Sequence, residues 1–91
     1  MEIDSAKKAA VLRLLTAGFS GSAIRTSYDQ VRLAWRFAID GDSRDTLWLD
    51  LAEEWLDDHS EAAIEELLRG EGIVDRLRRE RKVLVTHETL R

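Results

Sequence analysis

The chain has 91 residues, of which 44% are hydrophobic and 35% charged, and it contains no cysteine and no proline. This length predicts a single domain, residues 1–91, with one hydrophobic core. The absence of cysteine excludes disulfides, thiolate metal sites and a cysteine nucleophile. Because no apolar run is long enough to span a bilayer, and because the first residues are too acidic and polar for a signal peptide, a cytoplasmic location without a membrane partner is expected.

The net charge of −4 conceals three consecutive segments of opposite sign. Residues 1–39 carry six basic and three acidic side chains, residues 40–75 carry two basic and thirteen acidic, and residues 76–91 carry six basic and two acidic. An acidic centre between basic ends predicts either internal ion pairing or a surface for a basic partner.

The spacing of apolar residues predicts an all-α fold, a bundle of four to five helices. A first helix is expected to start at Asp4 or Ser5, either of which can cap it, and to run through Ala17. Gly18 is then expected to be the left-handed residue that follows the helix end.

A second helix is expected from Ser22 to Asp40, because apolar residues recur there at spacings of four, three, four and three. A competing interpretation is a capping box at residues 27–30, Ser-Tyr-Asp-Gln, which would divide this stretch into a short helix and a longer one.

Residues 44–58, RDTLWLDLAEEWLDD, hold two of the three tryptophans and predict the central helix of the bundle. Projected on a helix, their apolar residues fill an arc of roughly 200°, which is too wide for one neighbour. This helix is therefore expected to be packed on two sides, with its tryptophans in the core and an acidic ridge in water.

Ser60 is expected to cap a fourth helix that ends at Gly70, and residues 73–82 predict a fifth. Residues 83–87, Val-Leu-Val-Thr-His, are rich in β-branched side chains and suit either a strand or an extension of the helix. A single strand has no partner in an otherwise helical chain, so residues 83–91 are expected to form a flexible or partner-binding tail.

Carboxylates of the acidic centre are predicted to share one helical face that binds a partner protein with a basic surface, for instance a nucleic-acid-binding protein. Several are like-charge pairs four residues apart, each unfavourable by roughly 0.2 to 0.5 kcal/mol, so compensation is expected. The alternative is internal pairing with Arg32, Arg36 or the basic run at residues 76–82. The predicted face consists of Asp50, Glu53, Glu54, Asp57, Asp58, Glu61 and Glu65.

Residues 14–25, LLTAGFSGSAIR, resemble the front half of a helix-turn-helix, in which a first helix ends in glycine and a serine opens the second. The resemblance implies a DNA-binding regulator that acts as a homodimer, with residues 27–36 as its recognition helix. Arg25 departs from the pattern, which favours a small apolar residue there, and an ordinary helical hairpin is the competing interpretation. The implied nucleic-acid-binding residues are Lys7, Lys8, Arg25, Ser27, Gln30, Arg32 and Arg36.

No catalytic residue, metal site or cofactor is expected. Asp57, Asp58 and His59 are neighbours in sequence and would point to different sides of a helix, and His87 has no acidic or nucleophilic residue near it in sequence that forms a catalytic pattern. The sequence thus predicts a non-catalytic regulatory or inhibitory module that binds proteins, with a DNA-binding regulator and a helical component of a larger assembly as alternatives.

Overall fold

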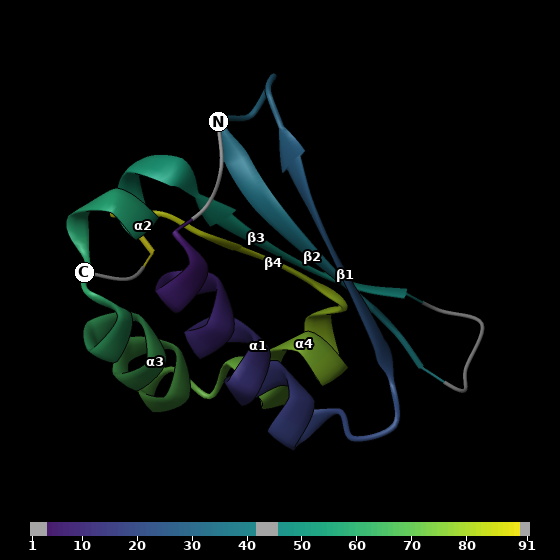
Figure 1. The fold of residues 1–91 in the computed structure, drawn as a ribbon. Helices are drawn as coiled ribbons and strands as arrows, with labels where there is room; N and C mark the ends of the chain where they lie inside the picture. Colours follow the sequence, from purple (N-terminus) through teal and green to yellow (C-terminus); the bar gives the residue numbers. More distant parts are fainter. Residues whose placement is uncertain (1–3, 42–45, 90–91) are drawn as a thin grey trace.

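The chain folds into a four-stranded sheet with helices packed on one of its faces (Figure 1). The computed structural model describes residues 4–41 and 46–89. The predicted all-α bundle is wrong, because the fold is α+β. In chain order the elements are α1 (Ser5–Gly18), β1 (Ala23–Asp29), β2 (Ala34–Asp40), β3 (Thr46–Ala52), α2 (Glu53–Asp58), α3 (Glu61–Gly70), α4 (Ile73–Glu80) and β4 (Lys82–Val85).

The strands follow one another across the sheet in the order β1-β2-β3-β4. The first three form an antiparallel meander, in which Trp35 lies between Tyr28 and Leu51. β4 runs parallel to β3, and Val83 lies beside Leu49. The three helices α2, α3 and α4 form the crossover that a parallel pair requires.

The core lies between the sheet and the helices. Side chains alternate along each strand, so every second residue points toward the helices. The buried sheet residues Phe37, Ile39, Leu49, Leu51, Val83 and Val85 pack there against Val11, Leu14, Leu15, Trp55, Leu56, Ile64, Leu68, Ile73 and Leu77 of the helices. No helix of residues 4–41 and 46–89 covers the other face of the sheet (Figure 1).

The predicted helix at Ser22 to Asp40 is wrong, and so is the alternative with a capping box at residues 27–30. This stretch is the β1–β2 hairpin. Its apolar residues fit a period of two as well as the helical one, because Trp35, Phe37 and Ile39 alternate with shorter or charged residues. β-branched and aromatic side chains favour the strand, and pairing with β3 adds stability that a local pattern does not reveal.

The predicted central helix at residues 44–58 is also wrong. Its first part lies outside the described residues, and the remainder is the strand β3 followed by the short helix α2. Leu47, Leu49 and Leu51 point toward the helices, and Trp48 and Asp50 point away from them. The wide apolar arc arose because a strand with period two was projected on a helix.

Three helices agree with the sequence-based expectation. Asp4 caps α1 by accepting hydrogen bonds from the backbone N–H groups of Ala6 (2.9 Å) and Lys7 (3.2 Å). Ser60 caps α3, whose last residue is Gly70, and α4 occupies most of residues 73–82. These starts and ends depend on local capping, which sequence shows directly.

Two details at the ends of helices differ from expectation. Gly18 is the last residue of α1, and the left-handed glycine of the following connection is Gly21, with φ of 85°. Residues 83–85 form a strand that pairs within the chain, so the expectation that it has no internal partner is wrong. None of the helices in the described ranges is both long and apolar enough to cross a membrane.

Candidate functional site

The sheet face that points away from the helices is the first candidate site, and we call it the open face. Because strand residues alternate, its members follow from the register of the four strands. They are Ala23, Arg25, Ser27, Asp29, Ala34, Arg36, Ala38, Asp40, Thr46, Trp48, Asp50, Ala52, Lys82 and Leu84.

An ordered cluster of Arg36, Trp48 and Asp50 occupies the centre of the open face. Arg36 donates two hydrogen bonds to Asp50, from Nε to Oδ1 at 2.7 Å and from Nη2 to Oδ2 at 3.0 Å. The guanidinium also lies 4.8 Å from the ring centroid of Trp48. Asp50 is only 2% exposed, and the hydrogen bonding of Arg36 to its carboxylate raises the pKa of Arg36. The bidentate hydrogen bond to Asp50 and the contact with the Trp48 ring together fix the Arg36 side chain in one geometry.

A second arginine reaches the same carboxylate from the β1–β2 turn. Arg32 Nη1 lies 3.7 Å from Asp50 Oδ2, and Arg32 Nε lies 3.9 Å from Asp29 Oδ2. The turn is held by Asp29, whose Oδ1 accepts hydrogen bonds from the backbone N–H groups of Val31 (2.9 Å) and Arg32 (3.2 Å). The buried carboxylate of Asp50 is therefore neutralised by two guanidinium groups from different segments.

A further arginine–aspartate pair lies at the opposite end of the hairpin. Arg25 donates to both oxygens of Asp40, at 2.8 and 3.2 Å, and Thr46 Oγ1 donates to Asp40 Oδ1 at 2.8 Å. These hydrogen bonds, from Thr46 first and Arg25 second, lower the pKa of Asp40. The guanidinium groups of Arg25 and Arg36 thus each donate two hydrogen bonds to a carboxylate of the same face.

Apolar side chains accompany these polar groups. Trp48 is half-buried although no helix in the described part of the chain lies over it, and Leu84, beside Asp50 in β4, is 47% exposed. Trp48 was expected in the core, and its register shows why that expectation is wrong: it alternates with Leu47 and Leu49, which take the inner positions. That alternation is the signal in the sequence that could have identified it.

The predicted acidic residues do not lie on the face of one helix, because they belong to a strand and two helices. Asp50 is buried on the open face, and Glu53 accepts a hydrogen bond from the Tyr28 hydroxyl at 2.8 Å, which raises the pKa of Tyr28. Glu65 lies 3.3 Å from Arg69 and 3.7 Å from Arg13. The exposed remainder, which we call the acidic corner, consists of Glu54, Asp57, Asp58 and Glu61.

The predicted nucleic-acid-binding residues are divided between the two layers. Arg25, Ser27 and Arg36 lie on the open face, and Arg32 and Gln30 lie in the β1–β2 turn. Residues 27–36 are a strand, a turn and part of a second strand, so the implied recognition helix is absent from this stretch. The remaining two residues, Lys7 and Lys8, belong to α1.

Lys7 has a structural role that its position in the sequence did not reveal. Its Nζ donates to the backbone carbonyl of Leu56 at 2.7 Å and lies 3.5 Å from that of Asp57. These carbonyls belong to the last turn of α2, where a positive charge is favourable.

Two histidines that are distant in sequence meet beside the acidic corner. The rings of His59 and His87 lie 6.0 Å apart, and Asp58 Oδ2 lies 2.8 Å from His87 Nε2 in a poor orientation for a hydrogen bond. His59 Nδ1 lies 2.7 Å from the carbonyl oxygen of Trp55. Within residues 4–41 and 46–89, no three histidine or acidic side chains are placed to hold a metal ion.

Comparison of the chain with protein families, with characterised proteins and with solved structures found no match.

Proposed function

We propose that this chain is a non-catalytic regulatory or inhibitory module that binds a partner protein on the open face. The observation that supports this proposal is the ordered cluster of Arg36, Asp50 and Trp48 on a sheet face that the described helices leave uncovered. Tryptophan and arginine are the residue types that contribute most to binding energy at protein interfaces. Because Arg36 is already held in place, docking on it costs little additional side-chain entropy.

Charge on the open face favours a protein over a nucleic acid. The carboxylates of Asp40 and Asp50 accept hydrogen bonds from Arg25 and Arg36. The phosphates of a nucleic acid would have to compete with these carboxylates. Single-stranded nucleic acid is usually bound by several stacking aromatics along a basic groove, and the register places one aromatic, Trp48, on the open face. A partner with an apolar centre and polar rim suits this composition better.

The test begins with a photo-crosslinking amino acid in place of Leu84, which identifies the protein that touches the open face. The dissociation constant of that purified protein is then measured for the unmodified chain, for Trp48→Ala and for Thr16→Ala, a control on the exposed side of α1. Loss of a central tryptophan costs at least about 2 kcal/mol at an interface, so Trp48→Ala should weaken binding about 30-fold.

Circular dichroism must show that each variant stays folded. Equal affinity of Trp48→Ala and Thr16→Ala would contradict the proposal. Binding to duplex DNA that disappears in Trp48→Ala would contradict it as well, and would assign the open face to nucleic acid instead.

The acidic corner supports a second candidate function, the binding of a basic protein. Glu54, Asp57 and Glu61 are exposed within eight residues, and Asp58 Oδ2 next to them lies 2.8 Å from His87 Nε2. Such a surface accelerates association with an oppositely charged partner, and the effect weakens with salt.

Charge reversal of all four residues of the acidic corner to lysine tests this candidate. Glu53 is left unchanged because it binds the Tyr28 hydroxyl. The control is Asp75→Lys, on α4, where the side chain is 82% exposed. Loss of binding to the basic protein in the fourfold variant, with binding kept in the control, supports a binding role for the acidic corner. Binding that persists in the fourfold variant refutes that role.

A further inference from the structure

β1 is an edge strand of the sheet, and no strand of the described residues pairs with its outer side. All seven of its residues pair with β2. Within the described ranges, no backbone hydrogen bond joins residues 23–29 to any segment other than β2. A regular edge strand of this length is a template for pairing with another strand.

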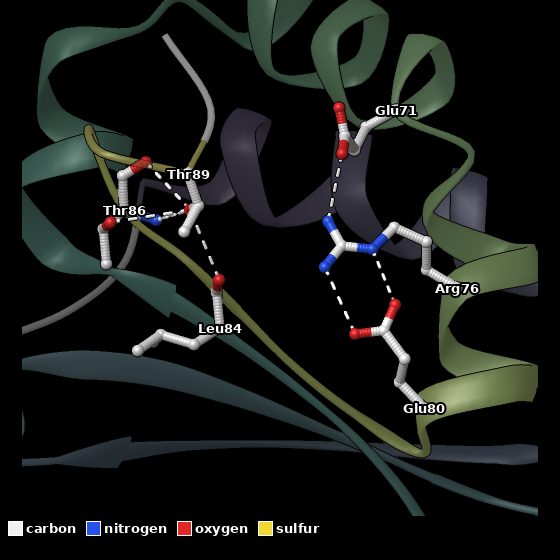
Figure 2. A network of polar contacts seen from close by, with 6 residues as sticks. All are labelled: Glu71, Arg76, Glu80, Leu84, Thr86 and Thr89. Carbon is white, nitrogen blue, oxygen red and sulfur yellow. Dashed lines mark hydrogen bonds and ion pairs between the residues drawn. The ribbon is translucent and has the colours of Figure 1, made fainter.

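The opposite edge strand, β4, is protected from pairing with another strand by features that β1 lacks. β4 has only four residues, and the turn that follows folds back on it, as Figure 2 shows. Thr89 Oγ1 donates to the carbonyl of Leu84 at 3.3 Å, and it accepts a hydrogen bond from the backbone N–H of Thr86 at 2.7 Å. β1 has no proline, and its inward positions are Ile24, Thr26 and Tyr28, none of which is charged.

The sequence of β1 is complementary to itself in an antiparallel arrangement. With Ser27 at the centre, Arg25 of one copy lies opposite Asp29 of the other, and Thr26 lies opposite Tyr28. Opposite charges placed across from each other stabilise a strand pair, whereas a centre at Arg25 would place two arginines opposite each other. This register also keeps inward residues opposite inward residues, so the helices of both copies cover the same face.

We propose that two copies of this chain associate through antiparallel pairing of β1 with β1, centred on Ser27. The result is a continuous eight-stranded sheet in which Arg25 of each copy lies opposite Asp29 of the other and binds it in competition with Asp40 of its own chain. The open faces of the two copies then form one surface. This inference does not depend on the proposed partner, because pairing of β1 uses backbone groups and the two ends of the strand rather than Trp48 or Arg36.

Sedimentation equilibrium over a range of concentrations tests the association. Arg25→Glu replaces both attractive pairs by repulsive ones, so the dimer dissociation constant should rise by about tenfold. Arg25 also binds Asp40 within its own chain, and Asp40→Asn is therefore the matched control. Because it removes the carboxylate that competes for Arg25, the dimer dissociation constant should not rise. A monomer at every concentration, or equal effects of the two variants, would overturn the proposal.

Single cysteine variants test the register, because the chain has no cysteine of its own. Directly opposite residues of an antiparallel pair have Cα atoms about 4.5 to 5.5 Å apart, which a disulfide can bridge. Ser27→Cys should therefore form a covalent dimer on mild oxidation. Thr26→Cys should remain monomeric under the same conditions, because its counterpart lies two residues further along, beyond the limit of about 7 Å. Faster cross-linking at Thr26 than at Ser27 would overturn the register.

Discussion

Leu33 is the residue at which the β1–β2 turn departs most from favourable backbone geometry. Its φ is 53°, in the left-handed region that residues with a Cβ atom avoid. Its carbonyl accepts a hydrogen bond from the backbone N–H of Glu53 at 2.9 Å, which ties the turn to the start of α2. The side chain itself is 55% exposed, so its burial offsets little of the free-energy cost of this backbone conformation.

We expect Leu33→Gly to raise the free energy of unfolding by about 1 kcal/mol, because glycine adopts this conformation without a steric penalty. Urea denaturation provides the measurement. Val31→Gly is the matched control: Val31 is 93% exposed in the same turn and has an ordinary φ, so glycine there should lower stability. Equal losses at both positions would show that Leu33 is not strained.

The amino group of Lys7 links α1 to the end of α2, and its removal provides a second test at this scale. Lys7→Met keeps most of the aliphatic chain and removes the charged donor to the Leu56 carbonyl. We expect a loss of about 1 kcal/mol in the free energy of unfolding. Lys8→Met, one residue further along α1, should change it by much less; comparable losses would argue against a specific role for Lys7.

At the scale of elements, the starts of helices are predictable from sequence because their signal is local, whereas strands that depend on distant partners are not. The caps at Asp4 and Ser60 mark the starts of α1 and α3 without reference to other segments. The apolar residues of β1, β2 and β3 satisfy both the helical period and the strand period over short distances, so the local pattern predicts helices where the structure has strands. β4 could be suspected from its β-branched residues, but its partner β3 lies more than thirty residues earlier.

The candidate sites followed the same division. The acidic corner was visible as charge, whereas the cluster on the open face required the sheet register, which brings Arg36 beside Asp50 across two strands. Four of the seven predicted nucleic-acid-binding residues do gather on or beside that face. Their arrangement on strands and a turn is not predictable from a helical periodicity, because that periodicity contains no information on strand register.

Contact between α1 and α4 depends on Gly18, and this gives a prediction about element packing. A Cβ atom at Gly18 would lie 2.6 Å from both γ-methyl groups of Val74. We expect Gly18→Ala to lower the free energy of unfolding by about 1 to 3 kcal/mol, because α4 must shift to admit the methyl group. Thermal or urea denaturation measures the effect.

Two further variants separate this clash from a general effect of alanine. Gly70, the last residue of α3, has no atom within 4 Å of a Cβ at its position, so Gly70→Ala should be neutral or slightly stabilising. Adding Val74→Ala to Gly18→Ala should make the glycine substitution less costly than it is alone. Additive effects of the two substitutions would contradict the proposed contact.

In the whole molecule, the fold brings basic and acidic side chains of the three charge segments together in ion pairs. Arginines of the first segment meet carboxylates of the acidic second segment, as in the pairs Arg25–Asp40 and Arg36–Asp50. The basic third segment contributes Arg76, which binds Glu80 at 2.9 Å and Glu71 at 3.1 Å (Figure 2). Internal pairing therefore accounts for much of the charge pattern, and the acidic corner is a group of carboxylates that stays exposed.

This pairing predicts how stability depends on pH. Hydrogen bonds from Thr46 and Arg25 lower the pKa of Asp40, and those from Arg76 lower the pKa of Glu80. A carboxyl whose pKa is lower in the folded than in the unfolded chain stabilises the fold above its unfolded pKa, about 4, and this contribution is lost as the pH falls through the folded pKa. The free energy of unfolding should therefore change little between about pH 7 and 5 and decrease below about pH 4.

Urea denaturation at several pH values, applied to Asp40→Asn and Glu80→Gln, isolates these contributions. Each variant should be less stable than the unmodified chain near neutral pH and should lose less stability on acidification, because the group that titrates has been removed. Glu88→Gln is the control, since Glu88 is exposed and makes no ion pair in the described structure. If all three variants follow the acid profile of the unmodified chain, the arginine-paired carboxylates do not govern its acid lability.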